Sequence, residues 1–391
     1  MAITINAKTS GAGGLETTAD NTGNINIQSG GSTVMSVTSS GVAVTGSFSQ
    51  NGAVYSTQPS FRNLIINGDM RIDQRNAGAS VSSNNSYAVD RLRNVFTSSG
   101  SFTAQQSTTA PDNFTNSVVW TVGSAASATS SQVANMQYRL EGNTLYQLGF
   151  GTSAAKTMTL SFWVRSSVTG TYCAAFINSA ADRAYVAEYT ISSANTWEQK
   201  SITLTGDTSG TWLTTNGIGL RIQFDLGSGS DYNATANTWV GANDFRTTNQ
   251  TDFINNAGAT FYITGVQLEV GDTATPFEHR PYDMELQRCK RYYYTTYPIG
   301  VAPGTVGAYA CQAEYAPPYN GNHVATWQHP VSMRAAPTMT GYAEDGTSGS
   351  FTTGAGNQTA QFYQTTSAVI SPFASFNGTY LKLLFTASAE L

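Results

Sequence analysis

Short runs of alternating apolar and polar residues recur along this chain, and they predict β strands rather than long helices. The clearest run is MTLSFWVR at 158–165, in which every second residue is apolar, as in a strand with one buried face. Similar runs lie at 202–204, 218–224 and 261–263, and polar loops separate them. We therefore predict that residues 59–278 form one all-β domain, a jelly-roll sandwich.

The last of these runs changes its phase at Gly265. Apolar side chains precede this glycine at Phe261 and Ile263, and they follow it at Val266, Leu268 and Val270. One extra residue inserted into a strand shifts the alternation in this way, and glycine is a frequent residue at such a position. The pattern predicts a β-bulge at Gly265 in the final strand of the sandwich.

After Pro281 the apolar spacing becomes helical. The positions that form one stripe are 4, 3 and 4 residues apart: Tyr282, Leu286, Cys289 and Tyr293. Acidic residues come early in this segment and basic residues come late, which suits the helix dipole. We predict a linking helix at 279–295. Because so short a helix is marginal alone, its stripe needs a partner. The flanking domains and two symmetry mates are the alternatives, and we predict trimer contacts.

The first 58 residues are a separate segment, with short apolar runs at 25–27, 34–37 and 42–44. So few apolar groups cannot offset the chain entropy of folding alone. The segment is therefore either a disordered arm or a self-associating β shaft, and the regular recurrence favours the shaft. Residues 296–391 predict a small C-terminal β domain whose last strand covers 379–389.

Composition narrows the function classes. The chain has 391 residues, a net charge of -5 and only 11% charged residues. An acidic chain is a poor sequence-independent binder of nucleic acid, which needs a basic surface. No apolar run reaches membrane-spanning length, and no secretory signal is visible at the N-terminus. The three cysteines are too few for a disulfide framework, and Cys173 and Cys289 fit buried thiols.

No motif for nucleophilic catalysis, phosphate binding or zinc binding is present. Acidic residues cluster in one polar loop at Asp225, Asp231, Asp244 and Asp252. Such a cluster fits solvated side chains, a structural calcium site or, least well, a catalytic carboxylate pair. We predict no catalytic residue, no metal ligand set and no cofactor, with the calcium ion left as an alternative.

Sugar binding suits two loop regions in which aromatic rings lie among Gly, Asn and Pro. One region carries Tyr232 and Trp239, and the other carries Tyr315, Tyr319 and Trp327. Aromatic faces stack on the C–H surfaces of sugars, while amide and hydroxyl groups bind sugar hydroxyls. We predict these five residues as ligand contacts. The alternative is that Trp239 and Trp327 belong to the core at strand edges.

Four stretches give the chain a resemblance to fibre proteins of tailed bacteriophages. NLIINGDMRIDQRNAGAS at 63–80 resembles the opening of a fibre domain, and GVQLEVGDTATPFEHRPYDMELQRCKRYYY at 265–294 resembles its closing strand and following helix. HPVSMRAAPTM and FTASAEL resemble the C-terminal unit that often follows. The domain is also similar to jelly-roll carbohydrate-binding modules. Leu92 departs from this pattern, because the family often has Trp there.

The resemblance implies a homotrimer that is located on the virion and assembled in the host cytoplasm. It implies other virion proteins as partners of residues 1–58, and host surface polysaccharide as the partner of the outer domains. We therefore expect a tail fibre that binds glycans without cleaving them, with no nucleic acid and no membrane insertion. The alternatives are a capsid decoration or head fibre with a structural role, and a tailspike that depolymerises polysaccharide.

Overall fold

The computed structural model describes residues 61–307, 312–314, 322–324, 326–363, 365–375 and 380–391, together with strand segments before residue 56. The chain divides into two compact units, Met1–Phe61 and Arg62–Leu391. Within the described residues no helix is long and apolar enough to span a membrane.

The first unit contains one sheet and one hairpin. The sheet has the order β2-β1-β3-β4-β5, with β1 and β3 parallel and the other pairs antiparallel. The strands of this unit are β1 (Ile3–Ala7), β2 (Leu15–Ala19), β3 (Ile25–Ser29), β4 (Ser32–Thr38), β5 (Gly41–Val44), β6 (Phe48–Gln50) and β7 (Ala53–Tyr55). At the positions where burial is described, 25–28 and 32–38, no side chain is fully buried. Trimer formation stays a prediction.

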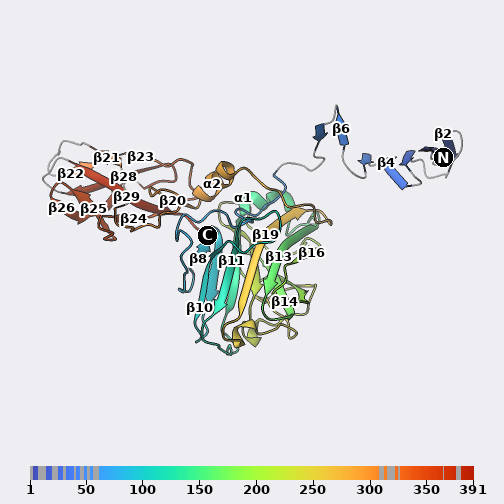
Figure 1. Ribbon diagram of the computed structural model, residues 1–391, viewed down its shortest axis with the longest axis horizontal. Coiled ribbons are helices and arrows are strands. Elements are labelled where there is room, and N and C mark those ends of the chain that lie inside the picture. The colour runs from blue at the N-terminus through green and yellow to red at the C-terminus, as the bar shows by residue number, and fades with distance from the viewer. Residues whose placement is uncertain are drawn as a thin grey trace. The chain divides into compact units, whose positions relative to one another are not determined.

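The second unit begins with a sandwich of two antiparallel sheets (Figure 1). The five-stranded sheet has the order β10-β11-β19-β13-β16: β10 (Phe102–Ser107), β11 (Ser117–Val122), β19 (Thr260–Val270), β13 (Met158–Ser166) and β16 (Glu198–Leu204). The seven-stranded sheet has the order β18-β15-β14-β17-β12-β9-β8: β18 (Trp239–Val240), β15 (Ala184–Ile191), β14 (Gly170–Ile177), β17 (Ile218–Asp225), β12 (Ala134–Glu141), β9 (Leu92–Phe96) and β8 (Tyr87–Val89). Short helices lie in the connections: α1 (Gly142–Leu145), η1 (Tyr146–Leu148), η2 (Ser230–Tyr232) and η3 (Phe253–Asn255).

The inward residues of both sheets form one core. Along β13, Leu160, Phe162 and Val164 are fully buried in it, as the alternation predicts. The predicted bulge is also present, because the pairing of β13 with β19 shifts register opposite Gly265, whose φ is +62°. The all-β jelly-roll prediction is therefore confirmed, and the bulge lies in the strand where the sequence placed it.

The linking helix α2 (Tyr282–Lys290) is shorter than the predicted 279–295, and β20 (Tyr293–Thr295) follows it. Leu286 and Cys289 pack against Ile72 within the same chain, and Cys289 is fully buried. The structure therefore differs from the predicted trimer stripe: Leu286, Cys289 and Tyr293 are buried within one chain, and only Tyr282 is exposed. The flanking domain provides the apolar partner.

Two of the stretches that carry the phage resemblance form one buried polar network. Arg280 donates to the carbonyl oxygens of Ile65, at 3.0 Å, and of Asn63, and it pairs with Glu285 at 3.1 Å. Glu285 in turn accepts a hydrogen bond from the backbone N–H of Asn67. Gly68 is needed beside them, because a Cβ there would lie 2.1 Å from the carbonyl oxygen of Val266. Polar residues about 200 positions apart along the chain thus satisfy one another.

The rest of the second unit is a smaller β domain built around β29 (Leu381–Ser388), which matches the predicted last strand. β20, β21, β24 and β25 all pair with β29, and β26 follows β25. The remaining strands, β22, β23 and β27, pair with β28. The bounds of the strands in this domain are β21 (Gln312–Glu314), β22 (Asn322–Val324), β23 (Trp327–Gln328), β24 (Thr338–Tyr342), β25 (Ser350–Thr353), β26 (Gly356–Thr359), β27 (Gln361–Tyr363) and β28 (Val369–Ser375).

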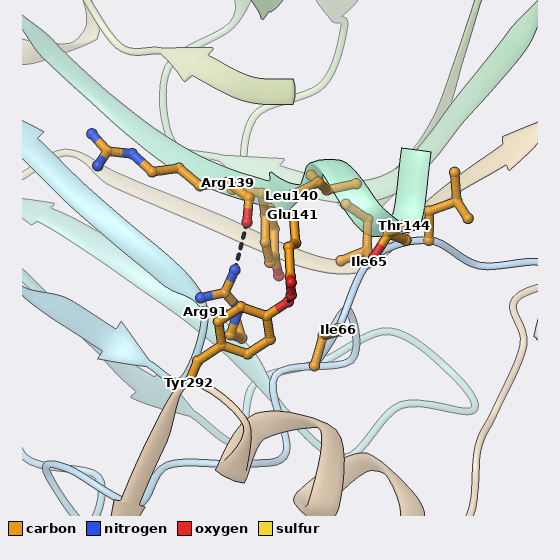
Figure 2. Close-up of a pocket in the computed structure, with 10 residues that line it drawn as sticks. Ile65, Ile66, Arg91, Arg139, Leu140, Glu141, Thr144 and Tyr292 are labelled. Atoms are coloured by element: carbon orange, nitrogen blue, oxygen red, sulfur yellow. Dashed lines mark hydrogen bonds between the residues drawn. The ribbon is translucent and has the colours of Figure 1, made fainter. Parts of the chain in front are cut away.

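Buried charges join this smaller domain to the sandwich. Glu390 pairs with Arg75 at 2.6 Å and also with Arg91. The Arg91 guanidinium lies 3.6 Å from the ring centre of Tyr292, whose hydroxyl donates to Glu141 at 2.8 Å. Figure 2 shows the Tyr292 ring beside Arg91 and reaching Glu141, around a cavity of about 10 Å³. That volume is close to the space one water molecule occupies.

Two buried aspartates make stability depend on pH. Burial raises the pKa of Asp90 from 3.8 to about 7, against the opposing effect of Arg75. Burial likewise raises the pKa of Asp225 from 3.8 to about 6. Both carboxyl groups stay protonated to higher pH in the native state than in the unfolded chain. Their contribution to the free energy of unfolding is therefore full below pH 4 and is lost as the pH rises through 6 and 7.

We expect Asp90→Asn to remove the larger part of this dependence. The wild type should lose on the order of 2 kcal/mol of unfolding free energy from this residue between about pH 4 and 7. Urea unfolding of both proteins at several pH values across that window measures it. Parallel pH profiles for wild type and variant would contradict the assignment.

Candidate glycan-binding cleft

An open cleft of about 350 Å³ lies on the outer face of the five-stranded sheet. It forms where β13, β16 and β19 lie next to one another (Figure 1). Its lining mixes aromatic rings with short polar side chains: Asp112, Asn113, Phe114, Ser161, Trp163, Gln199, Gly265, Pro276, Phe277 and His279. Binding sites for small ligands commonly combine an apolar surface with a few polar groups in this way.

Trp163 is the largest side chain in the cleft. Its neighbours on β13, Phe162 and Val164, point into the core, so Trp163 points to the opposite face and is only half-buried. It lies directly across from Gln199 on β16 in the strand register. Within the described residues its indole N–H makes no hydrogen bond, and the ring and its donor are both available to a ligand.

The bulge at Gly265 makes room for the cleft. A Cβ at this position would lie 2.8 Å from the Cζ atom of Phe114 and 3.0 Å from the Cδ1 atom of Trp163. Real Cβ atoms rarely come so near another atom, and the φ of +62° also favours glycine. Glycine therefore allows the two rings to approach each other over the strand.

Phe114, Phe277 and His279 form an aromatic wall beside Trp163. Their ring centres lie 4.9–5.2 Å apart, which is the usual range for contacting rings. Burial lowers the pKa of His279, and Arg71 acts in the same direction while Asp69 opposes it. A lowered pKa keeps the imidazole neutral at pH 7, so that one ring nitrogen donates and the other accepts a hydrogen bond.

The polar residues of the lining suit hydroxyl groups. Asp112 and Asn113 lie exposed in the turn before Phe114, and Gln199 is exposed on β16. A carboxylate accepts hydrogen bonds, and amides both donate and accept them. The cleft thus offers flat apolar rings together with donors and acceptors, which matches the alternating C–H faces and hydroxyl edges of a sugar.

Trp239, which the sequence predicted as a ligand contact, belongs to an aromatic cluster at the edge of the core. Its ring lies 5.5 Å from Trp212 and 5.3 Å from Tyr185, and its N–H donates to the carbonyl of Thr205 at 2.9 Å. This position fits the core alternative. Trp212 also lines a separate apolar cavity of about 180 Å³ beside α1.

The other described contacts, Tyr232 and Trp327, are also placed elsewhere. Tyr232 stacks on Phe245 at 4.2 Å and covers the outer face of the seven-stranded sheet. Trp327 packs on Phe385 at 5.5 Å in the C-terminal core. Tyr315 and Tyr319 lie outside the described residues. The structure brings none of the described predicted contacts into the cleft around Trp163.

The aspartates of the acidic loop do not gather into one cluster. No group of three or more His, Cys, Asp or Glu side chains suited to a metal ion occurs among the described residues. Asp225 is fully buried and accepts hydrogen bonds from the backbone N–H groups of Gly227 and Ser228. Asp252 pairs with Arg246 at 3.1 Å. Both thiols predicted to be buried, Cys173 and Cys289, are fully buried.

A signal for Trp163 was present in the sequence. The alternation of MTLSFWVR places Trp163 on the polar face of its strand, together with Ser161 and Arg165. This alternation places the Trp163 ring on the side of the sheet away from the core, which is where the cleft lies. The contributions of Phe114 and His279 had no such signal, because they come from loops.

No family model matches this chain, and no curated protein matches it. Among solved structures it is similar to the enzymatically active domain of tailspike protein 4 of bacteriophage CBA120, at 15% identity and a TM-score of 0.28. That match covers 54% of this chain but only 22% of the tailspike.

Two sugar-binding modules are also similar in structure. The family 11 carbohydrate-binding module of a Clostridium thermocellum cellulase matches at 12% identity and a TM-score of 0.27, over 51% of this chain and 99% of that module. The module TmCBM61, solved with β-1,4-galactotriose, matches at 11% identity and a TM-score of 0.26, over 54% of this chain and 99% of its own. Both the sequence identity and the structural similarity are low.

Proposed function

We propose that this protein is a homotrimeric virion fibre of a tailed bacteriophage that attaches to host surface glycans without cleaving them. The observation that carries the glycan assignment is the open cleft in which Trp163 lies among other aromatic rings and polar side chains. The phage assignment rests on the sequence resemblance of residues 63–80 and 265–294.

The small number of carboxylates in the cleft lining favours binding without cleavage. Among its lining residues Asp112 is the single carboxylate. Enzymatic hydrolysis of a glycosidic bond ordinarily uses two carboxyl groups on opposite sides of the bond. A stacking platform with one acid is better suited to holding a sugar than to breaking it. The first unit is assigned to trimer formation and to contact with other virion proteins.

The test uses the purified full chain on an array of bacterial capsular and O-antigen polysaccharides. We expect wild type to bind at least one of them. Trp163→Ala should weaken that binding by about 2 kcal/mol, or roughly 30-fold, because central aromatic anchors carry much of the binding energy. Titration calorimetry with the polysaccharide identified on the array measures the change.

Trp197→Ala is the matched control. Trp197 directly precedes β16 of the same sheet, and it is also half-buried. Its ring centre lies 6.1 Å from that of Tyr262, and it does not line the cleft. This variant should bind like wild type. Equal affinities for wild type and Trp163→Ala would reject the cleft. New reducing ends released from the polysaccharide would reject the non-enzymatic assignment.

A further inference from the structure

The outer face of the seven-stranded sheet carries three arginines on adjacent strands. In the strand register Arg139 of β12 lies opposite Arg221 of β17, and Gln137 of β12 lies opposite both Arg93 of β9 and Gln223 of β17. The alternate residues of these strands, such as Tyr138 and Ile222, belong to the sandwich core. The arginines therefore point to the other side, where all three are half-buried.

Two of these arginines, Arg93 and Arg221, have donors without acceptors. The Arg93 side chain makes no hydrogen bond or ion pair with the part of the chain that the structure describes. The Nε atom of Arg221 is buried without a partner, although its Nη2 atom donates to the carbonyl of Asn178 at 2.9 Å. Unsatisfied donors on a charged side chain are costly when they are removed from water. The arrangement has spare capacity for an acceptor.

Neighbouring amides hold Arg139 in place. Arg139 donates to Gln137, Gln137 donates to Asn135 at 3.0 Å, and Asn135 donates to Gln223 at 3.4 Å. Asn135, Gln137 and Gln223 are all buried, so this series orders the Arg139 guanidinium from within the sheet face. Donors from β9, β12 and β17 thus gather on one face of the sheet.

The positive charges also repel one another. Arg139 donates at 2.7 Å to the terminal carboxylate oxygen of Leu391, whereas Arg93 and Arg221 form no ion pair with a carboxylate among the described residues. Burial and the nearby Arg93 and Arg221 lower the pKa of Arg139 to about 10. An anion placed among them would relieve this repulsion and accept the free hydrogen bonds at the same time.

We propose that this arginine face, defined by Arg93, Arg139 and Arg221, binds the acidic groups of a glycan. Carboxylates of uronic acids and phosphate or sulfate esters share the required chemistry, which is a planar or tetrahedral oxyanion held by guanidinium groups. The face lies on the opposite sheet from the Trp163 cleft, so the inference goes beyond the proposed function and does not depend on that cleft.

A polysaccharide fits the face better than a nucleic acid does. The net charge of the chain is -5, and a phosphate backbone would meet repulsion from the rest of the surface. The arginines are spread over three strands with spacings of about 4.8 Å, so they cover a length of roughly 10 Å rather than a single ion site. Such a length matches neighbouring sugar units that carry separate charged groups.

The test is titration calorimetry of the full chain with three probes, compared first at one ionic strength and then with added salt. The probes are a hyaluronan hexasaccharide, which carries carboxylates, a phosphate-substituted oligosaccharide, and neutral maltohexaose. We expect at least one acidic probe to bind, maltohexaose not to bind at this face, and added salt to weaken the binding. Sodium sulfate and sodium phosphate serve as free-ion probes, and binding of these alone would replace the glycan by a small oxyanion.

Arg93→Gln is the main variant, because Arg93 has no bond within the described chain whose loss would unfold the protein. It should weaken the acidic probe about tenfold. Arg165→Gln is the matched control, since it removes the same charge from the opposite sheet, where Arg165 lies 5.1 Å from the ring centre of Tyr262. The proposal would be overturned if Arg93→Gln bound the acidic probe as wild type does, or if both variants lost the same affinity. Displacement of the acidic probe by duplex DNA would also overturn it. If Trp163→Ala loses binding of the acidic probe while Arg93→Gln keeps it, the acidic glycan binds in the Trp163 cleft and the proposal is wrong.

Discussion

Replacing Glu390 with alanine should lower the free energy of unfolding of the second unit by about 3–5 kcal/mol. The Glu390 side chain is 9% exposed and lies between Arg75 and Arg91, which are 14% and 4% exposed. Removing the carboxylate leaves two buried guanidinium groups without their shared counter-charge. The loss is large because Arg91 is left buried without a carboxylate partner, while Arg75 keeps only the more distant Asp90, at 3.5 Å.

Glu344→Ala provides the comparison. Glu344 pairs with Lys382 at 2.6 Å, the same distance as between Glu390 and Arg75, but these side chains are 30% and 28% exposed. An ion pair that water reaches contributes about 0–1 kcal/mol. Urea unfolding of wild type and both variants, followed by near-ultraviolet circular dichroism, measures the difference. Similar midpoints for the two variants would show that burial does not set the strength of the Glu390 contacts.

Gly265→Val should cost about 2–6 kcal/mol of stability and also abolish glycan binding. A β-branched residue at a φ of +62° is strained, and strain of this kind costs about 1–3 kcal/mol. The new side chain would also meet Phe114 and Trp163, and overpacking costs about 1–3 kcal/mol more. Because those two rings form the cleft, their displacement should remove the binding surface even where the protein stays folded.

Gly258→Val separates the two effects. Gly258 has a φ of +78°, but nothing lies within 4 Å of a Cβ placed there. This variant should show the strain alone and bind glycan as wild type does. Thermal unfolding and titration calorimetry on both variants make the comparison. Intact glycan binding in folded Gly265→Val would mean that the bulge does not shape the cleft.

The fold was predictable because each strand carries its own evidence. The alternation in 158–165 fixes which side of β13 faces the core, and the phase change at Gly265 is visible in a window of ten residues. The helix near Tyr282 was predicted from its spacing, but its partner was not. Burial of Leu286 depends on Ile72, which lies more than 200 positions earlier in the chain.

The cleft was not predictable in the same way. Trp163 comes from a strand, whereas Phe114, Phe277 and His279 come from two loops that are distant in sequence. Aromatic residues among Gly and Asn in 226–252 indicated exposed rings, but Tyr232 and Trp239 pack against their own domain. Local composition shows that a ring lies in a loop, and it does not show which surface the loop covers.

The bonds between early and late residues bear on how the chain reaches its native state. Arg280 binds the backbone of Asn63, which is 217 positions away, and Glu390 binds Arg75 across 315 positions. During synthesis the first strands of the sandwich therefore leave the ribosome long before their closing partners do. Contacts of such long range slow folding and leave strand edges unpaired in the meantime. Production of this protein should therefore benefit from slow translation at low temperature.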